Sequence, residues 1–438
     1  MVKKSGSLNF ALHALGAICL GAFLDSCSTA RVETDPAVAQ QAPAPAVEDH
    51  GPPGRISALW KKRLNGYVTD LAVSADGKAL LVASAPNHDA ADGSREYRVR
   101  RFDAAGEEDW SVRPSAPVKS LAISRDGKVS VVATYDDTIT AYDEDGDILW
   151  TVEATCRPVL LARAAKFVCY HDDDAEPRVA FDVFDLAGKK LLSHAIQQDI
   201  LALKVSRDER NLAIALTGGQ VVLFGPDFKP VWQRTLAGEV SDLDVTSGPE
   251  PRVAALFQPE FHPGSPAPAA GGSARERERA RAGRHAPQRI ALIDPAGRSQ
   301  IDAEPAQFCE QVTFTDNGDG VVVHGNGSQG QYVGVFTVPA AGKGPFRARW
   351  SKVVPHFSDN SARLMVAPGQ VIVGFEEATQ FSRQSRLMSL GSARGNDRWS
   401  VPIQTDEGAY LYTDGVAGDG RFLVIGSDDG RVAAFRFE

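Results

Sequence analysis

A short frame of residues recurs along this chain, and it limits the folds that the sequence can adopt. An acidic turn residue is followed by a glycine three positions later and by a tryptophan four positions after that, as in Asp143-Glu144-Asp145-Gly146-Asp147-Ile148-Leu149-Trp150. The same frame stands at Asp103-Gly106-Trp110. It recurs with an aliphatic residue in the tryptophan position at Asp185-Gly188-Leu192 and Asp294-Gly297-Ile301. The recurrence indicates one structural unit copied along the chain.

All six tryptophans belong to this series. Together with two aliphatic residues they make eight anchors at intervals of 40 to 69 residues: Trp60, Trp110, Trp150, Leu192, Trp232, Ile301, Trp350 and Trp399. A repeat of this length, built from short strands, is typical of β-propellers. A blade is a small twisted sheet that cannot bury both of its faces alone. We therefore expect each anchor to pack against the neighbouring blade.

Apolar residues between the anchors alternate with the period of β-strands. In the first unit, Val68–Val73 and Ala79–Ala83 flank a tight turn, and Tyr97–Phe102 gives a third strand. Eight such units fill residues 55–438. The last unit lacks only its outer strand, and the chain begins with a spare one at Ile56–Trp60. We predict an all-β, eight-bladed propeller closed by this N-terminal strand, with seven blades as the alternative.

The residues before the propeller predict a targeting signal and a spacer. A mostly apolar stretch follows Lys3 and Lys4, and Leu24-Asp25-Ser26-Cys27 is similar to a bacterial lipobox, although Asp25 departs from it. We expect residues 1–26 to be a signal peptide and Cys27 to be lipidated. An ordinary signal peptide with an incidental cysteine is the alternative. Residues 27–54, rich in alanine and proline, predict a disordered tether.

Charge and composition favour some partners over others. The net charge of −9 argues against nucleic acid as the main partner, because that would need a basic face. An insertion at about residues 259–287 interrupts the fifth unit, and we expect it to be a disordered, solvated loop. The alternating charges of Arg275–Arg281 leave a basic docking arm as the alternative.

Several motifs are similar to cofactor sites but lack the context that such sites need. Gly325–Gly330 spells a dinucleotide-binding motif, yet strands flank it on both sides, so we predict a hairpin. Asp143–Asp147 is similar to a calcium loop, but Ala154 stands where an EF-hand needs a glutamate. The histidines show no metal-binding spacing. The sequence therefore supports no metal or cofactor.

The five cysteines include no C-x-x-C pair. Cys156 and Cys169 flank one predicted hairpin at nearly opposite positions, which would allow a disulfide in an oxidising compartment. Two buried thiols are the alternative. Cys309 would then remain unpaired.

The Asp-x-x-Gly-x-x-x-Trp frame in blades of this length resembles the PQQ-type, or quinoprotein-like, propeller repeat over nearly all of residues 55–438. With a lipid-anchor signal and a single eight-bladed ring, the chain resembles the BamB-type lipoproteins of outer-membrane barrel assembly. That resemblance implies a non-enzymatic scaffold on the periplasmic face of the outer membrane, held there by its lipid alone. It also implies an envelope protein partner, such as a barrel-assembly component.

The enzymatic relatives in the quinoprotein group typically carry adjacent cysteines over the cofactor and a calcium site. This sequence has no Cys-Cys dipeptide. We therefore expect no enzyme and no bound PQQ or calcium, with a PQQ-type oxidoreductase and a ligand-sensing or adhesion propeller as alternatives. The segments entering the innermost strands carry acidic residues that could form a face for a basic partner: Glu153, Asp199, Glu239, Glu310, Asp406 and Glu407. Solvated polar loops are the alternative.

Overall fold

β-strands and turns make up the parts of the chain that the computed structural model describes, and no helix occurs in them. These parts are residues 56–86, 96–154, 157–161, 166–170, 179–196, 198–259, 287–327, 330–339, 346–354, 363–378, 383–403, 411–417, 422–427 and 429–437. Among them there is accordingly no helix long and apolar enough to span a bilayer. The predicted signal peptide, Cys27, the tether and residues 260–286 of the insertion lie outside the described residues.

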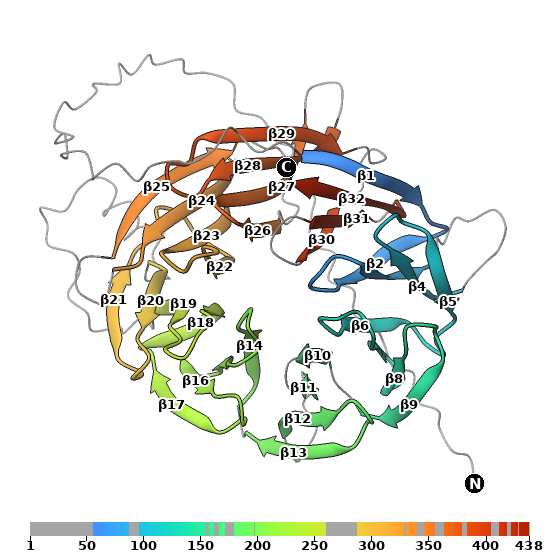
Figure 1. The fold of residues 1–438 in the computed structure, drawn as a ribbon. Helices are drawn as coiled ribbons and strands as arrows, with labels where there is room; N and C mark the ends of the chain where they lie inside the picture. Colours follow the sequence, from blue (N-terminus) through green and yellow to red (C-terminus); the bar gives the residue numbers. More distant parts are fainter. Residues whose placement is uncertain are drawn as a thin grey trace, which may run out of the picture. The chain divides into compact units, whose positions relative to one another are not determined.

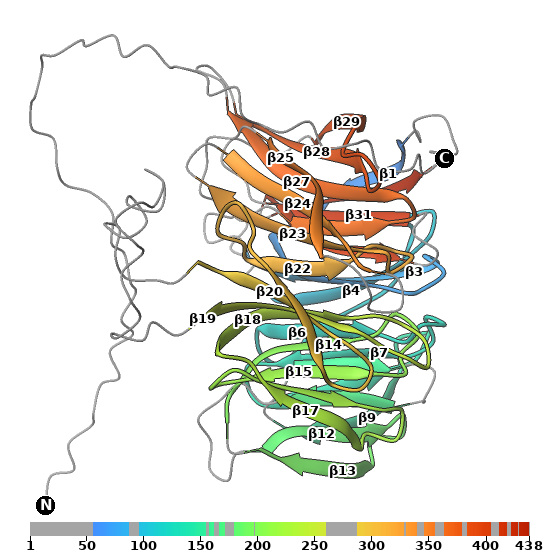
Figure 2. The ribbon, with the colours of Figure 1, turned by 90° about the vertical axis from the view of Figure 1, so that its left-hand side faces the viewer.

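The strands form eight four-stranded antiparallel sheets, which stand as blades around a ring (Figure 1). In blades 1 to 7 the strands follow in chain order from the centre of the ring to its rim. Figure 2 shows the ring from its side, with the strands running from one face to the other.

Each of blades 1 to 4 is a meander of four consecutive strands. Blade 1 consists of β2 (Tyr67–Val73), β3 (Ala79–Ala85), β4 (Arg98–Asp103) and β5 (Glu108–Val112), and blade 2 of β6 (Val118–Ile123), β7 (Ser130–Thr134), β8 (Thr138–Tyr142) and β9 (Ile148–Glu153). Blade 3 consists of β10 (Arg157–Leu161), β11 (Lys166–Tyr170), β12 (Val179–Asp185) and β13 (Lys190–Ala195), and blade 4 of β14 (Ile200–Val205), β15 (Leu212–Leu216), β16 (Gln220–Phe224) and β17 (Pro230–Thr235).

Blades 5 to 7 repeat the meander, and blade 8 departs from it. Blade 5 consists of β18 (Gly238–Val245), β19 (Val253–Pro259), β20 (Arg289–Ile293) and β21 (Ser299–Ala303), and blade 6 of β22 (Gln311–Phe314), β23 (Gly320–Gly327), β24 (Gly330–Thr337) and β25 (Arg347–Val354). Blade 7 consists of β26 (Arg363–Ala367), β27 (Gln370–Ala378), β28 (Arg383–Gly391) and β29 (Asp397–Ile403), and blade 8 of β30 (Leu411–Ala417), β31 (Phe422–Ser427), β32 (Arg431–Phe437) and β1 (Ile56–Arg63).

Blade 8 closes the ring with strands from both ends of the described chain. β1 pairs antiparallel with β32, from Ile56 opposite Phe437 to Arg63 opposite Arg431. The order of this sheet is β1-β32-β31-β30, so β1 is its outer strand. The prediction of eight blades closed by the N-terminal strand is confirmed, and the seven-bladed alternative is wrong.

The hydrophobic core lies between neighbouring blades. One cluster joins Val131 and Ile139 of blade 2 to Phe167 and Phe184 of blade 3, and all four side chains are buried. Phe167 also stacks on Trp150 of blade 2, with ring centroids 5.2 Å apart. Each blade therefore buries its faces only against its neighbours, as expected for a propeller.

The tryptophan anchors pack on the glycine turn of the next blade, not on the turn that precedes them in sequence. The Trp110 ring of blade 1 lies over Gly146 of blade 2, where an added β-carbon would come within 2.7 Å of the ring. Its indole N–H donates to the Glu144 carbonyl at 3.2 Å. Four further pairs repeat this contact: Trp60 with Gly106, Trp150 with Gly188, Trp232 with Gly297 and Trp350 with Gly395.

Among the described residues Trp399 meets no such turn, because the outer strand of blade 8 comes from the other end of the chain. It instead donates its indole N–H to Gln370 Oε1 at 3.1 Å. Its ring stacks on Phe437 of β32, with centroids 5.9 Å apart. The seam between blades 7 and 8 is therefore built from contacts unlike those at the other tryptophans.

Aspartates at β-bulges of the innermost strands also join neighbouring blades. In blade 1, Asp70 Oδ2 accepts a hydrogen bond from the Leu121 N–H of blade 2 at 2.7 Å. In blade 5, Asp242 Oδ2 accepts one from the Val312 N–H of blade 6 at 2.8 Å. A bulge turns one side chain out of the regular pleat, and here it aims a carboxylate at the next strand.

Burial raises the pKa of the Asp242 carboxyl, against the opposing effects of Lys204 and the Val312 N–H. The folded state therefore binds this proton more tightly than the unfolded state, so the contribution of Asp242 to stability falls as pH rises from the ordinary aspartate pKa through the raised one. We expect Asp242→Asn to be at least as stable as wild type at pH 7, and to lose this advantage near pH 4. Asp242→Ala should cost about 1–3 kcal/mol, because the Val312 N–H loses its acceptor. Urea unfolding at both pH values measures these differences, and equal stability of the Asn and Ala variants would contradict the proposed bond.

Side chains from turns on one face reach across the middle of the ring. Arg125, in the turn after β6, donates to the Arg207 carbonyl at 2.9 Å. Arg207, in the turn after β14, bonds through its guanidinium to Asp316 Oδ1 and to the Val366 carbonyl. These contacts tie blades 2, 4, 6 and 7 together on this face.

Candidate protein-binding face

The two faces of the ring carry different connections. Because neighbouring strands are antiparallel, the connections between blades emerge on the same face as the turns between the second and third strands. We call this the connection face. The turns with Arg125 and Arg207 lie on the opposite face.

Four of the predicted acidic residues lie at the connection face and are exposed. Glu153 is the last residue of β9, and Asp199 directly precedes β14. Glu239 was expected just before its strand but is the second residue of β18, and Glu310 directly precedes β22. Asp406 and Glu407 lie outside the described residues. The role of these side chains in binding stays a prediction.

Further carboxylates, which the sequence reasoning missed, share the connection face. They come from the turns between second and third strands as well as from the connections between blades: Glu96, Asp136, Asp137 and Glu304. In the described parts of these connections and turns, Arg113 is the only basic residue, and it forms an ion pair with Glu96 at 2.6 Å. In the described connections and turns of this face, acidic residues therefore outnumber basic ones.

Two exposed aromatic side chains stand among these carboxylates. Tyr135 begins the turn after β7 and is 63% exposed, and Phe308 lies in the connection before β22 and is 54% exposed. Most large apolar side chains of the described strands are buried, so these two depart from the pattern. Aromatic residues are enriched in protein interfaces.

Hydrogen bonds of the neighbouring residues fix the backbone at both aromatic positions. Beside Tyr135, Asp136 accepts hydrogen bonds from Ser115 Oγ at 2.6 Å and Thr134 Oγ1 at 2.5 Å. These bonds hold the pKa of the Asp136 carboxyl below its ordinary value, so it is charged at neutral pH. Beside Phe308, the Cys309 N–H donates to Gln288 Oε1 at 2.7 Å, and Gln288 Nε2 donates to the Cys309 carbonyl at 2.8 Å.

A second exposed apolar surface, the apolar belt, crosses the outer strands of blades 2 to 4. It consists of Ile148 and Leu149 of β9, Leu191 of β13 and Val231 of β17, all at least 45% exposed. The positions equivalent to Leu149 in blades 1, 6 and 7 hold Asp109, Arg349 and Arg398. Blade 8 holds Leu59 at this position, 37% exposed, so the exposed apolar residues are consecutive only across blades 2 to 4.

The cysteine predictions are tested only in part. Cys309 is a free, fully buried thiol, and burial raises its pKa, so we expect it to be unreactive. Cys169 is buried and disulfide-bonded. The register places Cys169 opposite Pro158. Cys156, its predicted partner, lies outside the described residues, so this pairing stays a prediction.

The described residues hold no group of three or more His, Cys, Asp or Glu side chains placed to bind a metal ion. Gly325–Gly330 lies in the β23–β24 hairpin, where Gly327 pairs with Gly330. The motif therefore has no helix beside it to receive a pyrophosphate, and the hairpin prediction is confirmed.

Comparison with known proteins shows which protein family this chain resembles. A family model described as outer membrane protein assembly factor BamB matches residues 56–175. The crystal structure of BamB from Moraxella catarrhalis superposes with a TM-score of 0.59 at 14% identity, covering 87% of this chain and 100% of that one. The chain is a PQQ-like β-propeller that resembles BamB.

Other comparisons limit what this resemblance carries. The structure of Saccharomyces cerevisiae Sqt1 superposes nearly as well, with a TM-score of 0.57 at 12% identity over 86% of this chain and 98% of that one. No curated protein sequence matches the chain. At these identities the solved structures show a shared fold, and function has to be argued from the surfaces of this ring.

Proposed function

We propose that this protein is a non-enzymatic binding scaffold of the bacterial cell envelope, whose connection face docks a protein partner. The observation that carries this proposal is the set of exposed carboxylates around Tyr135 and Phe308. A basic partner surface with apolar groups would complement both features: the charges would speed association, and the aromatic side chains would supply buried contact area.

The resemblance to BamB supports a finer proposal about place and partner. We propose that Cys27 carries a lipid that holds the ring at the periplasmic face of the outer membrane. The lipid would be its only contact with the membrane. The partner would then be an envelope protein, with a component of the barrel-assembly machinery as the first candidate.

The partner can be sought from the face itself. A photo-crosslinking amino acid in place of Phe308, in the full-length protein in its own membranes, should capture one dominant protein that mass spectrometry identifies. The same substitution at Tyr135 should capture the same protein. The same amino acid at Lys128, on the opposite face, is the matched control and should not capture it.

Reversing the charge of the connection face should weaken this complex. We expect Glu153→Lys, Glu239→Lys and Glu310→Lys together to slow association about tenfold at low salt and less at high salt, because exposed charges act through long-range attraction. The control removes the apolar belt through Leu149→Ser, Leu191→Ser and Val231→Ser. A partner lost with the belt variant but kept by the charge variant would move the binding surface to the rim and overturn the assignment to this face.

Two other functions are separated from the scaffold by direct tests. A PQQ-type oxidoreductase would show cofactor absorbance and dye-linked alcohol oxidation after PQQ and calcium are added to the purified protein. A ligand-sensing or adhesion propeller would not co-purify with barrel-assembly components. We expect no oxidation and co-purification.

A further inference from the structure

Charge is segregated between two blades on opposite sides of the ring. Residues 129–156, which include β7 to β9 of blade 2, contain aspartates and glutamates but no lysine or arginine. Residues 320–358, which include β23 to β25 of blade 6, contain lysines and arginines but no aspartate or glutamate. The outer strands of these blades, β9 and β25, lie across the ring from each other (Figure 1). The two blades therefore carry opposite charges on opposite sides of the rim.

The acidic corner of blade 2 combines this negative charge with exposed apolar surface. It consists of the turn residues Glu144, Asp145 and Asp147 and of the first two residues of β9, Ile148 and Leu149, and all five side chains are exposed. None of the three carboxylates forms an ion pair with a described residue, and the chain around them is described without a gap from residue 96 to residue 154. The corner is therefore an unpartnered end of the outer strand with uncompensated negative charge.

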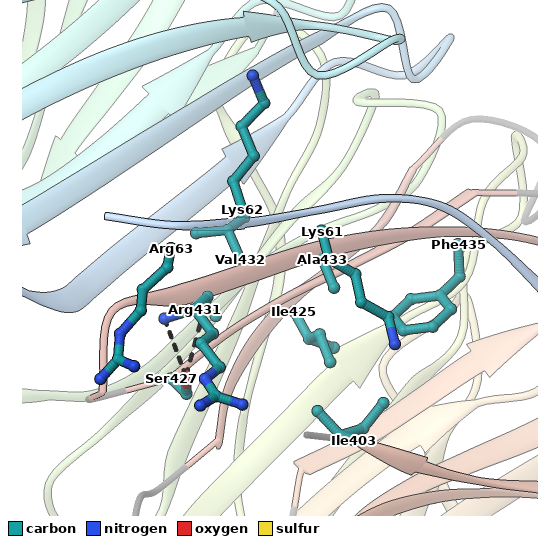
Figure 3. Close-up of a pocket in the computed structure, with 11 residues that line it drawn as sticks. Lys61, Lys62, Arg63, Ile403, Ile425, Ser427, Arg431, Val432, Ala433 and Phe435 are labelled. Atoms are coloured by element: carbon teal, nitrogen blue, oxygen red, sulfur yellow. Dashed lines mark hydrogen bonds between the residues drawn. The ribbon is translucent and has the colours of Figure 1, made fainter. Parts of the chain in front are cut away.

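The neighbouring carboxylates of blade 1 differ, because they are paired with cations. Lys62 extends away from the pocket of about 300 Å³ between blades 7 and 8 (Figure 3), and its ammonium group lies 3.8 Å from Glu107 Oε1. Arg101 Nε lies 3.2 Å from Asp109 Oδ2. Blade 1 therefore adds little net charge to the acidic corner.

The basic corner of blade 6 consists of Arg347, Arg349 and Lys352 of β25. Arg349 lies 3.3 Å from Asp319, and Lys352 forms an ion pair with Asp397. Arg347 is exposed and forms no ion pair with a described residue. Residues 340–345, just before this strand, lie outside the described residues, but their sequence includes one lysine and no carboxylate. The three cations of this corner therefore have two carboxylates between them.

Both corners lie at the same edge of the rim. β9 and β25 are outer strands, and each follows a turn between the third and fourth strands of its blade. Such turns emerge on the face opposite to the connection face, because neighbouring strands are antiparallel. A second ring beside the first, with its faces in the same directions, therefore brings its basic corner to the acidic corner of the first.

We propose that copies of this protein associate side by side, with the basic corner of one copy on the acidic corner of the next. The cations meet the carboxylates, and the aliphatic part of Arg347 covers Ile148 and Leu149. The interface is heterologous, since each copy contributes a different surface, so copies form rows with one unused corner at each end. All connection faces in a row point the same way, and the association does not depend on what they bind.

The association is weak and depends on salt. Each corner has far fewer than the roughly 20–30 residues that each partner contributes to a stable interface. Sedimentation equilibrium of the full-length protein measures it. We expect the average mass to rise with protein concentration at about 0.01 M salt and to equal that of the monomer at about 1 M, where the Debye length is only about 3 Å. A monomer at every concentration at low salt overturns the proposal.

Variants of the two corners test the surfaces. Glu144→Lys with Asp145→Lys should weaken self-association at least tenfold at low salt, because the charge of the acidic corner is reversed. Arg347→Glu with Lys352→Gln should do the same from the other side. Thermal unfolding of each variant shows whether the ring is intact.

The control changes the net charge by the same amount on the connection face. Glu153→Lys with Glu239→Lys should change self-association less than twofold. An equal loss in this control and in the variant of the acidic corner would show a general effect of charge and would overturn the assignment to the corners.

A mixture of the two corner variants distinguishes a heterologous interface from other modes of association. Neither variant can form rows alone, but the first keeps its basic corner and the second keeps its acidic corner. An equimolar mixture should therefore form dimers of one copy of each that grow no further. Absence of dimers in the mixture would show that the copies do not join through opposite corners, and the proposal would be wrong.

Discussion

Replacing Gly106 by alanine should destabilise the ring by about 2–5 kcal/mol, which combines the cost of a left-handed backbone for a non-glycine residue with that of overpacking. Gly106 has φ 82°, and an added β-carbon would lie 2.5 Å from the Trp60 ring. Neither partner can yield easily, because Trp60 is held by β1 and by its hydrogen bond to the Ala104 carbonyl at 3.1 Å. Urea unfolding monitored by tryptophan fluorescence measures the loss.

Gly218 provides the matched control for this prediction. It has φ 77°, but nothing lies within 4 Å of an added β-carbon. Gly218→Ala should therefore cost only about 1–2 kcal/mol, the backbone part of the effect. In a double-mutant cycle, Trp60→Ala should relieve most of the overpacking in Gly106→Ala, so the two changes should not be additive. Additive effects would show that the ring and the turn do not press on each other.

Removing β1 should have the largest effect of all on stability. A chain starting at Leu64 leaves blade 8 with three strands, exposes the edge of β32 and removes Trp60 from its contact with Gly106. We expect the midpoint of thermal unfolding to fall by about 10 °C or more, and we expect aggregation through the exposed edge. A chain starting at Ile56 keeps every described strand and should unfold like the full-length protein.

A transplanted strand keeps this prediction testable even if the truncated chain does not fold. Ile56 lies opposite Phe437 in the antiparallel pair, so a short turn after Phe437 could lead directly into residues 56–63 as a hairpin. The chain that starts at Leu64 and carries this added strand should regain the stability of the control. If the truncated chain were as stable as the control, β1 would have no part in closure.

The connection face shows what sequence alone could and could not find. Glu153, Asp199, Glu239 and Glu310 were predictable because they stand where the chain enters each innermost strand. Asp136 and Tyr135 were not, because the turn after β7 reaches this face only through the antiparallel order of the blade. The pairing of Arg63 with Arg431 was hidden for a stronger reason: the two residues are 368 positions apart in the sequence and become neighbours only when β1 closes blade 8.

The repeat determined the architecture by itself. Eight anchors, six indoles and two aliphatic side chains, mark repeated units of short strands, and the first anchor lies on a spare strand at the start. Such units can bury their apolar faces only by joining into a ring. The tertiary structure decided which glycine each indole meets. Trp110 follows Gly106 in sequence but packs on Gly146, because a blade covers its neighbour and not itself. Within the described parts of the chain Trp399 meets no glycine turn and bonds to Gln370 instead, because β32 and β1 are not consecutive in sequence.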